Sequence, residues 1–210
     1  SEALELRDGD KARFRGKGVT KAVDNIHRLL APQLIGLEAR NQAEIDQRLI
    51  DIDGTPNKSN LGANALLGVS LALAHAAAAD ERVPLYRYLA GPGAVELPVP
   101  MINIISGGLH AGKNLDFQDF LIIPIGAETY RQALVMTHAI YYATKDVLLE
   151  KGYSTLAADE GGFGPALESN RAAFDVLMQS CERAGYTPGV DVVFALDVAS
   201  THFYHEGVYQ

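Results

Sequence analysis

The second half of the sequence alternates short apolar runs with longer helical patterns, and no other feature constrains the fold as strongly. Helical periodicity marks residues 129–151 and 169–184, and Gly185 is placed to end the second of these helices. The predicted strands are residues 97–105, 117–124 and 192–196. The last run is apolar throughout, as are strands buried on both faces of a parallel sheet or barrel. We therefore expect an α/β barrel.

The first 90 residues are predicted to be mainly helical. Apolar side chains recur at intervals of three and four over residues 19–30, which predicts an amphipathic helix that stops where Pro32 forbids its continuation. A second helix is expected over residues 41–50, with Ile45 and Leu49 facing inward.

One stretch, residues 61–79, is long and uncharged enough to raise the question of a membrane span. It contains Asn64, Ser70 and His75, however, and is dominated by alanine and glycine. We interpret it as a buried helix of a soluble domain, with Asn60 as its cap. No membrane span is expected.

The character of the sequence changes near Pro92, where the helical patterns end and the first apolar run follows. We therefore predict two domains, residues 1–92 and residues 93–210. A barrel of eight strand and helix units takes about 250 residues. Fewer than half as many follow position 97, so the second domain is expected to be only the first part of a barrel.

Charge and cysteine content narrow the function classes. The formal net charge is -8, with acidic residues spread along the sequence, which argues against nucleic acid or an anionic membrane surface as a partner. Cys181 is the one cysteine and lies in an apolar helical pattern. It is interpreted as a buried thiol, and a reducing cytoplasm is the expected compartment.

Residues 158–165 read Ala-Asp-Glu-Gly-Gly-Phe-Gly-Pro and contain the most informative local pattern. Two adjacent acids precede paired glycines, which let a backbone approach a ligand closely. One of these carboxylates is a functional candidate. Acids and glycines are also the residues of ordinary turns, so the spacing alone favours a structural turn.

Asp197 is a second candidate, because it directly follows the apolar run 192–196. In barrels the C-terminal ends of the strands face the active site, and a carboxylate oxygen there suits Mg²⁺. A helix cap or a loop acid is an equally good interpretation of the same residue.

A third candidate is the loop 107–114, which combines paired glycines with His110 and a lysine. Gln118 and Asp119 follow it inside an apolar run. A mobile lid over an anionic substrate has this composition. A single histidine in a loop is more often a surface residue, and only these neighbours favour a functional role for His110.

Taken together, these segments resemble the enolase family. The similarity extends from residue 2 to residue 209 without a large gap. The matching stretches are residues 2–10, 16–19, 61–71, 84–86, 110–112, 159–162 and 195–197. So many ordered matches do not arise by chance. The resemblance implies part of an α+β N-terminal domain, followed by the first part of an α/β barrel that begins strand, strand, helix, helix before regular repeats.

The resemblance also implies a reaction. Enolases interconvert 2-phosphoglycerate and phosphoenolpyruvate in glycolysis, with two Mg²⁺ ions that stabilise the enediolate, a lysine base and a glutamic acid that protonates the departing hydroxyl. By motif match, Glu160 would be that acid and Asp197 the first metal carboxylate. His110, Gln118 and Asp119 would line the substrate pocket. A cytoplasmic homodimer acting on a small phosphorylated acid is the corresponding expectation.

The sequence departs from the enolase pattern at several of these positions. The family generally has Glu at Asp119, Asn at Ser106, Gly at Ala158 and Ser-Glu at residues 201–202. Asp119 is one methylene shorter than Glu, and a displacement of about 1 Å can cost roughly 100-fold in rate.

Compared with the family, the sequence is expected to begin just after the mobile serine loop and to end before two metal carboxylates and two lysines. Three functions stay open: an enolase, an enolase-like lyase acting on a related phospho- or phosphono-acid, and a non-catalytic binding protein derived from an enolase. Asp119, Ser106 and His202 motivate the second. Hydrolytic and redox functions find no support, because the sequence has no nucleophile elbow, CxxC pair or dinucleotide-binding fingerprint.

Overall fold

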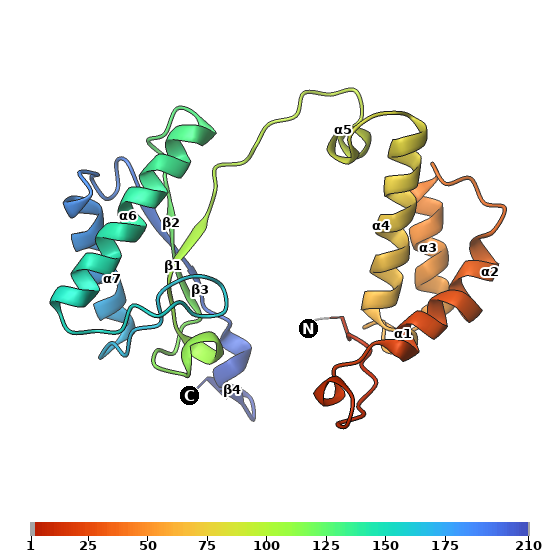
Figure 1. The fold of residues 1–210 in the computed structure, drawn as a ribbon, viewed down its shortest axis with the longest axis horizontal. Coiled ribbons are helices and arrows are strands. Elements are labelled where there is room, and N and C mark those ends of the chain that lie inside the picture. The colour runs from red at the N-terminus through yellow and green to blue at the C-terminus, as the bar shows by residue number, and fades with distance from the viewer. Residues whose placement is uncertain (1–2, 210) are drawn as a thin grey trace. The chain divides into compact units, whose positions relative to one another are not determined.

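The computed structural model describes residues 3–209, with the side chain of His110 excepted. The chain divides into two compact units, one ending at Val95 and the other beginning at Glu96 (Figure 1). Each unit has its own cluster of buried hydrophobic side chains. That the units correspond to the predicted domains 1–92 and 93–210 stays a prediction.

The first unit is helical. Its elements are η1 (Phe14–Gly16), α1 (Thr20–Asn25), η2 (Ile26–Leu30), α2 (Ala31–Leu34), α3 (Gln42–Asp53), α4 (Ala63–Asp80) and α5 (Leu85–Ala90). Ile45 and Leu49 of α3 are buried in its core, which confirms their predicted inward orientation.

The prediction that the first long helix stops at Pro32 is wrong. The chain remains helical to Leu34, because the intervening turn η2 is a π-helix. Its wider hydrogen-bond spacing is seen where the Ala31 N–H donates to the Ile26 carbonyl, five residues earlier. The wider turn accommodates Pro32, which has no N–H to donate and whose ring crowds a normal α-helical turn.

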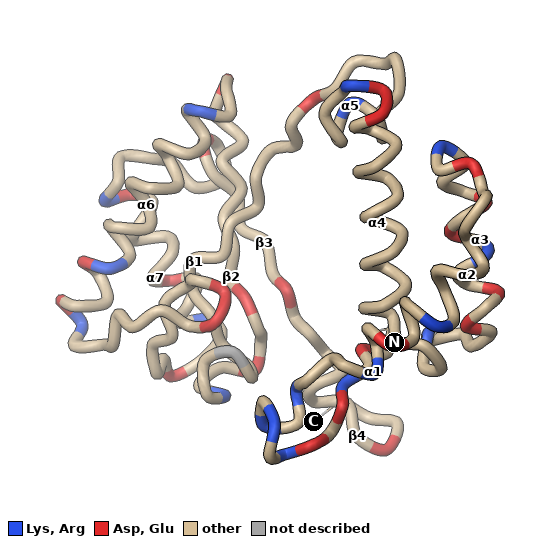
Figure 2. Tube along the Cα trace, turned by 45° about the vertical axis from the view of Figure 1, so that its right-hand side comes forward, with Lys and Arg blue, Asp and Glu red and all other residues tan. Residues whose placement is uncertain are grey.

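Helix α4 is the one helix within residues 3–209 that is long and apolar enough to cross a membrane, and 28% of its residues are buried. Figure 2 shows its trace free of charged residues until its end at Asp80. The prediction of a buried helix therefore holds for one face only. Ala65, Leu66, Ala74, Ala77 and Ala78 face the core, whereas the side chains of Leu67 and Leu71 are exposed.

Asn60 does not cap α4, contrary to the sequence-based expectation. The cap position is Gly62, with a φ of 98°, and the Asn60 side-chain amide donates instead to the Asp53 carbonyl at 3.1 Å. A Cβ at Gly62 would lie 2.5 Å from the Leu6 Cβ. The close passage of the N-terminal segment thus sets where the helix begins, and a glycine is needed there.

The second unit contains a sheet and two long helices. Its elements are β1 (Ile102–Ser106), η3 (Gly108–Ala111), β2 (Asp119–Ile123), α6 (Tyr130–Glu150), α7 (Asn170–Arg183), β3 (Val193–Asp197), η4 (Ser200–Phe203), β4 (Tyr204–His205) and β5 (Val208–Tyr209). The order strand, strand, helix, helix, strand confirms the expected α/β partial barrel. Helices α6 and α7 pack together against one side of the sheet (Figure 1).

The three long strands lie in the order β1-β2-β3, and both neighbouring pairs are antiparallel. Strand β3 was predicted to be buried on both faces of a parallel sheet or barrel. In the described residues it is an edge strand antiparallel to β2, and Leu196 and Asp197 are exposed. An apolar run of five residues fits a half-covered edge strand as well as a central one, so composition could not separate the two.

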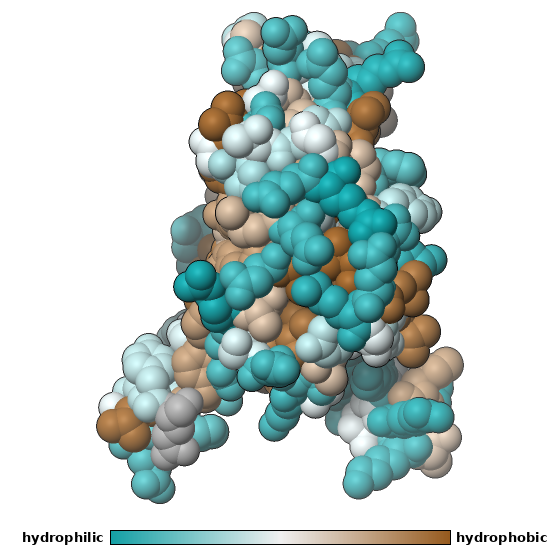
Figure 3. Space-filling model, turned by 90° about the vertical axis from the view of Figure 1, so that its left-hand side faces the viewer, coloured by the Kyte–Doolittle hydropathy of each residue, from teal (hydrophilic) through white to brown (hydrophobic). Residues whose placement is uncertain are grey.

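Local signals predicted the two long helices well. Thr129 and Gln132 form a capping box at the start of α6, and Ser169 caps α7. Gly185, with a φ of 84°, follows the end of α7 as expected. In Figure 3, which views the second unit from the side on which α6 and α7 lie in Figure 1, hydrophilic residues cover much of the surface, with hydrophobic side chains between them.

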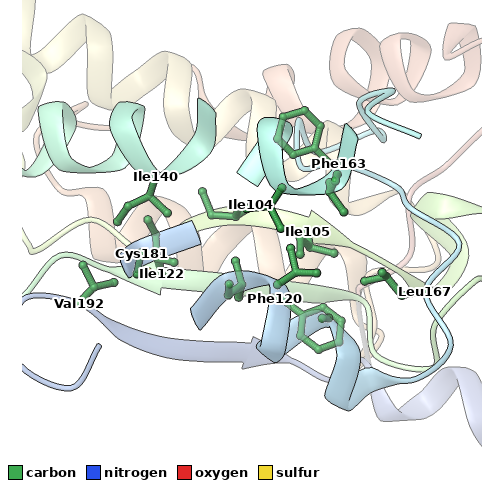
Figure 4. Close-up of a cluster of buried hydrophobic side chains, with 14 of the residues drawn as sticks. Ile104, Ile105, Phe120, Ile122, Ile140, Phe163, Leu167, Cys181 and Val192 are labelled. Carbon is green, nitrogen blue, oxygen red and sulfur yellow. The ribbon is translucent and has the colours of Figure 1, made fainter. Parts of the chain in front are cut away.

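Cys181 lies in the core between sheet and helices, close to Ile122 and Ile140 (Figure 4). Burial raises the pKa of its thiol to about 11. The predicted buried thiol is confirmed.

Candidate active site

The ends of the three strands bring polar side chains together. Ser106 at the end of β1 pairs with Asp119 at the start of β2, and Asp119 pairs with Asp197 at the end of β3. Directly paired residues project from the same face of a sheet. Because β2 runs antiparallel to its neighbours, it contributes its first residue to this end of the sheet, whereas β1 and β3 contribute their last residues.

The carboxylate of Asp119 is buried and fully engaged; the residue is 2% exposed. Its Oδ1 accepts hydrogen bonds from the Asn103 side-chain amide and from the Ser106 hydroxyl, the latter at 3.1 Å. Its Oδ2 accepts from the Gln118 amide at 3.3 Å. These three donors offset the cost of placing a carboxylate in the protein interior.

Asp197, in contrast, is exposed, and two hydrogen bonds orient its carboxylate. Its Oδ1 accepts from the Ala199 backbone N–H at 3.1 Å, and its Oδ2 accepts from the Gln118 side-chain amide at 3.4 Å. The backbone N–H of Gln118 also donates to the Asp197 carbonyl at 3.1 Å. The Gln118 amide therefore lies between the two carboxylates and donates to both.

The predicted turn around Glu160 is anchored to β1. Phe163 donates its N–H to the Ile104 carbonyl at 2.9 Å and accepts at its own carbonyl from the Ser106 N–H at 2.8 Å. A Cβ at Gly162 would lie 2.8 Å from the Ser106 hydroxyl, so this position needs glycine. Glu160 is exposed and lies two residues before Gly162. The close contact of Gly162 with Ser106 therefore holds the backbone of Glu160 near the end of β1.

An aromatic residue of α6 also contacts the turn that carries Glu160. The Tyr141 hydroxyl of α6 donates to the Gly161 carbonyl at 3.0 Å. The Tyr141 ring also stacks on that of Phe163, with centroids 4.4 Å apart. Helix α6 thereby fixes the turn against the sheet.

The loop with His110 folds back against the start of β2. Gly107 donates to the Gln118 carbonyl at 2.6 Å, and a Cβ at Gly108 would lie 3.3 Å from the Gln118 Cα. The backbone of His110 is part of η3, and its side chain lies outside the described part of the chain. A pocket of about 390 Å³ borders this loop. It is lined by Gly108, Leu109, Lys113, Leu115, Asp116, His202 and Phe203.

Of the residues predicted from the sequence, Gln118, Asp119 and Asp197 lie in direct contact, and the Glu160 turn packs beside them. Asn103 was missed, although it is the central donor to Asp119. Its signal was visible, because it is the one amide side chain in the apolar run 97–105. A polar residue inside a buried strand needs partners, which often belong to a functional site.

Mg²⁺ takes carboxylate and other oxygen ligands, which Asp197 and Asp119 could supply at the strand ends. Among the side chains that the structure describes, no three His, Cys, Asp or Glu are close enough to hold a metal together. Asp197 offers an exposed carboxylate, whereas that of Asp119 is buried beneath its hydrogen-bond donors. The described residues therefore fit one ligand position of such a site.

Comparison with known protein families adds an independent observation. Residues 1–89 match the family described as enolase, N-terminal domain. Residues 94–210, more than half of the chain, match the family described as enolase, C-terminal TIM barrel domain. The two matches run in the order of the two compact units and agree with the strand, strand, helix, helix order of the second. The chain therefore belongs to the enolase family of lyases.

Proposed function

We propose that the protein containing this chain interconverts 2-phosphoglycerate and phosphoenolpyruvate in glycolysis, with Mg²⁺ as cofactor. The observation that carries the proposal is that Asp197, Gln118 and the Glu160 turn lie together at one end of the sheet, where the strands begin or end. Family membership supports the reaction class.

In this proposal Glu160 protonates the hydroxyl that departs from the substrate. Its exposed position on a turn held by β1 and α6 supports that role, since an acid catalyst must be accessible and rigidly placed. Its neighbour Gly162 allows the turn to approach the sheet closely.

Gln118 and His110 are proposed to line the substrate pocket. The buried Asp119 accepts a hydrogen bond from the Gln118 side-chain amide. The adjoining pocket of about 390 Å³ is bordered by Lys113 and His202. Their basic side chains suit an anionic substrate such as a phosphorylated acid. Asp116, also on this border, accepts a hydrogen bond from the Asn170 amide at 3.0 Å.

Asp197 is proposed as one Mg²⁺ ligand, because its carboxylate is exposed and held in place by Gln118 and Ala199. A bound Mg²⁺ supplies charge neutralisation for the substrate carboxylate. Asp197 contributes a negative oxygen whose direction is fixed in advance.

The test uses the complete protein as its gene encodes it, with Mg²⁺ and 2-phosphoglycerate, and follows phosphoenolpyruvate by its ultraviolet absorbance. Removal of the general acid in Glu160→Gln is expected to lower kcat by roughly 100-fold or more. The matched control is Glu168→Gln, which neutralises another exposed glutamate, outside the turn that carries Glu160. Wild-type protein without turnover would refute the reaction, and an unimpaired Glu160→Gln variant would refute the role of Glu160.

A related phospho- or phosphono-acid is a second candidate substrate, favoured by the short, buried Asp119. If Asp119→Glu brings no gain with 2-phosphoglycerate and the related acid is turned over faster, this candidate replaces the first. A non-catalytic binding protein would turn over neither acid.

A cytoplasmic homodimer belongs to the same proposal and rests on the family alone. Light scattering of the purified protein measures the oligomeric state, and a monomer would contradict this part.

A further inference from the structure

A hydrogen-bonded chain leads from the interior of the second unit to its exposed carboxylate. Asn103 and Ser106 donate to Asp119, and the Gln118 amide connects Asp119 with Asp197. We infer that Asn103 and Ser106 are positioning residues that act through Asp119 and Gln118 to hold the Asp197 carboxylate. The inference rests on the proposed function insofar as Asp197 takes part in catalysis.

Burial separates the two carboxylates into different roles. Asp119 is 2% exposed and Ser106 fully buried, so neither side chain is accessible to a substrate. Asp197 and the turn of Glu160 are exposed. Asp119 is thus an internal acceptor that fixes its neighbours, although the family resemblance alone suggests that it lines the substrate pocket.

The orientation of Asn103 follows from the charge of Asp119. A carboxylate only accepts hydrogen bonds, so the NH₂ group of Asn103 must face it. That group donates to the Ser106 hydroxyl at 2.8 Å as well. The Asn103 Oδ1 then points away and is buried without a hydrogen-bond partner among the described residues. This unpaired oxygen is tolerated because the reverse orientation would set it against a negative charge.

The Gln118 amide has two hydrogens and serves two carboxylates, at 3.3 Å and 3.4 Å. If Asp119 turns away from its position, Gln118 loses one of its two acceptors and becomes free to rotate. Asp197 would then keep only the Ala199 N–H at its other oxygen. The position of Asp197 therefore depends on donors that never contact it.

The packing around Ser106 leaves little room for an alternative arrangement. A Cβ at Gly162 would lie 2.8 Å from the Ser106 hydroxyl and 2.9 Å from the Asn103 Oδ1. The turn that bears Glu160 thus covers the same hydrogen-bonded groups. Ser106 and Asp119 are two positions at which the sequence departs from the enolase pattern, and their 3.1 Å hydrogen bond makes these departures interdependent.

The first experiment compares Ser106→Ala with Ser180→Ala in the complete protein. Ser180 is a matched control, because it is also fully buried and its hydroxyl donates to the Val176 carbonyl on α7. The readouts are the side-chain amide resonance of Gln118 in an NMR spectrum, and kcat and KM with 2-phosphoglycerate. Ser106→Ala is expected to move the Gln118 resonance and to lower kcat by about tenfold, with KM within about twofold. Ser180→Ala is expected to do neither.

The second experiment combines Ser106→Ala with Asp119→Asn. If Ser106 acts through Asp119, the double variant will resemble Asp119→Asn alone in kcat and in the Gln118 resonance. Additive effects, or a Ser106→Ala variant with an unmoved resonance, would overturn the inference. If the wild type shows no turnover, the proposed reaction fails. The resonance then decides the inference by itself: a shift in Ser106→Ala that is absent in Ser180→Ala supports it, and no shift overturns it.

Discussion

Replacing Asp53 by asparagine removes one charge from a buried turn and changes little else in shape. Asp53 ends α3 and is 2% exposed. Its Oδ1 accepts from the backbone N–H of Thr55 at 3.0 Å and from the Thr55 hydroxyl. Its Oδ2 accepts from the Leu61 N–H at 2.8 Å, just before α4. The carboxylate therefore joins two helices of the first unit through three donors.

An asparagine has one acceptor oxygen and one NH₂ group, so in either orientation a donor would face a donor. The variant loses at least one hydrogen bond to a charged group and leaves a buried N–H unpaired. We expect the free energy of unfolding to fall by about 2–4 kcal/mol. The matched control is Asp51→Asn, an exposed carboxylate on the same helix, whose change should stay within about 0.5 kcal/mol.

The difference between wild type and Asp53→Asn should depend on pH. Burial acts to raise the pKa of Asp53, but hydrogen bonds from Thr55 and Leu61, with the nearby charge of Lys58, outweigh it and hold the pKa below the ordinary 3.8. A carboxyl whose pKa is lowered by folding stabilises the fold above its unfolded-state pKa and loses that contribution as the pH falls through the folded-state value. The difference should therefore be constant near neutrality and shrink below the ordinary value.

Urea unfolding followed by far-UV circular dichroism measures the stability at each pH. Hydrogen exchange at the Leu61 amide reports the first unit alone. A variant as stable as the wild type, or a difference that persists unchanged to the lowest pH, would refute the assigned hydrogen bonds.

Three further predictions concern the second unit. Gly162→Ala places a Cβ 2.8 Å from the Ser106 hydroxyl, and kcat should fall by about tenfold or more in the enolase assay; wild-type activity would contradict the close approach. Cys181, with a pKa raised to about 11, should resist alkylation in the folded protein at mildly alkaline pH and react at once in urea; fast labelling without denaturant would contradict its burial. Thr129→Ala removes the hydroxyl that accepts from the Gln132 N–H at 3.1 Å and should lower the unfolding free energy by about 1 kcal/mol in urea titrations; no change would contradict the capping box.

Local patterns in the sequence predicted much of the helical structure. The predicted helices 129–151 and 169–184 correspond to α6 and α7, and Gly185 follows the end of α7 as predicted, because a helix and its end depend on residues a few positions apart. Where the expectation failed, distant contacts decided. The start of α4 at Gly62 depends on the passage of Leu6, and the edge position of β3 depends on its pairing with β2.

The candidate site divides in the same way. The residue types at Glu160, Gln118 and Asp197 were recognisable, because acids and amides beside glycines or strand ends stand out from apolar surroundings. Their burial and their hydrogen-bond partners were not. Asp119 and Asp197 are both aspartates at strand ends, yet one is buried under three donors and the other is exposed.

The sequence by itself determined most of the helices, the buried cysteine and the membership of the enolase family, since these depend on local periodicity or ordered motifs. Only the tertiary structure decided which polar groups meet. Gln118 reaches Asp197 across 79 positions in the chain, and Asn103 reaches Asp119 across 16. Those contacts depend on the antiparallel register of three strands, which distributes partners by spatial pairing and leaves no local trace in the sequence.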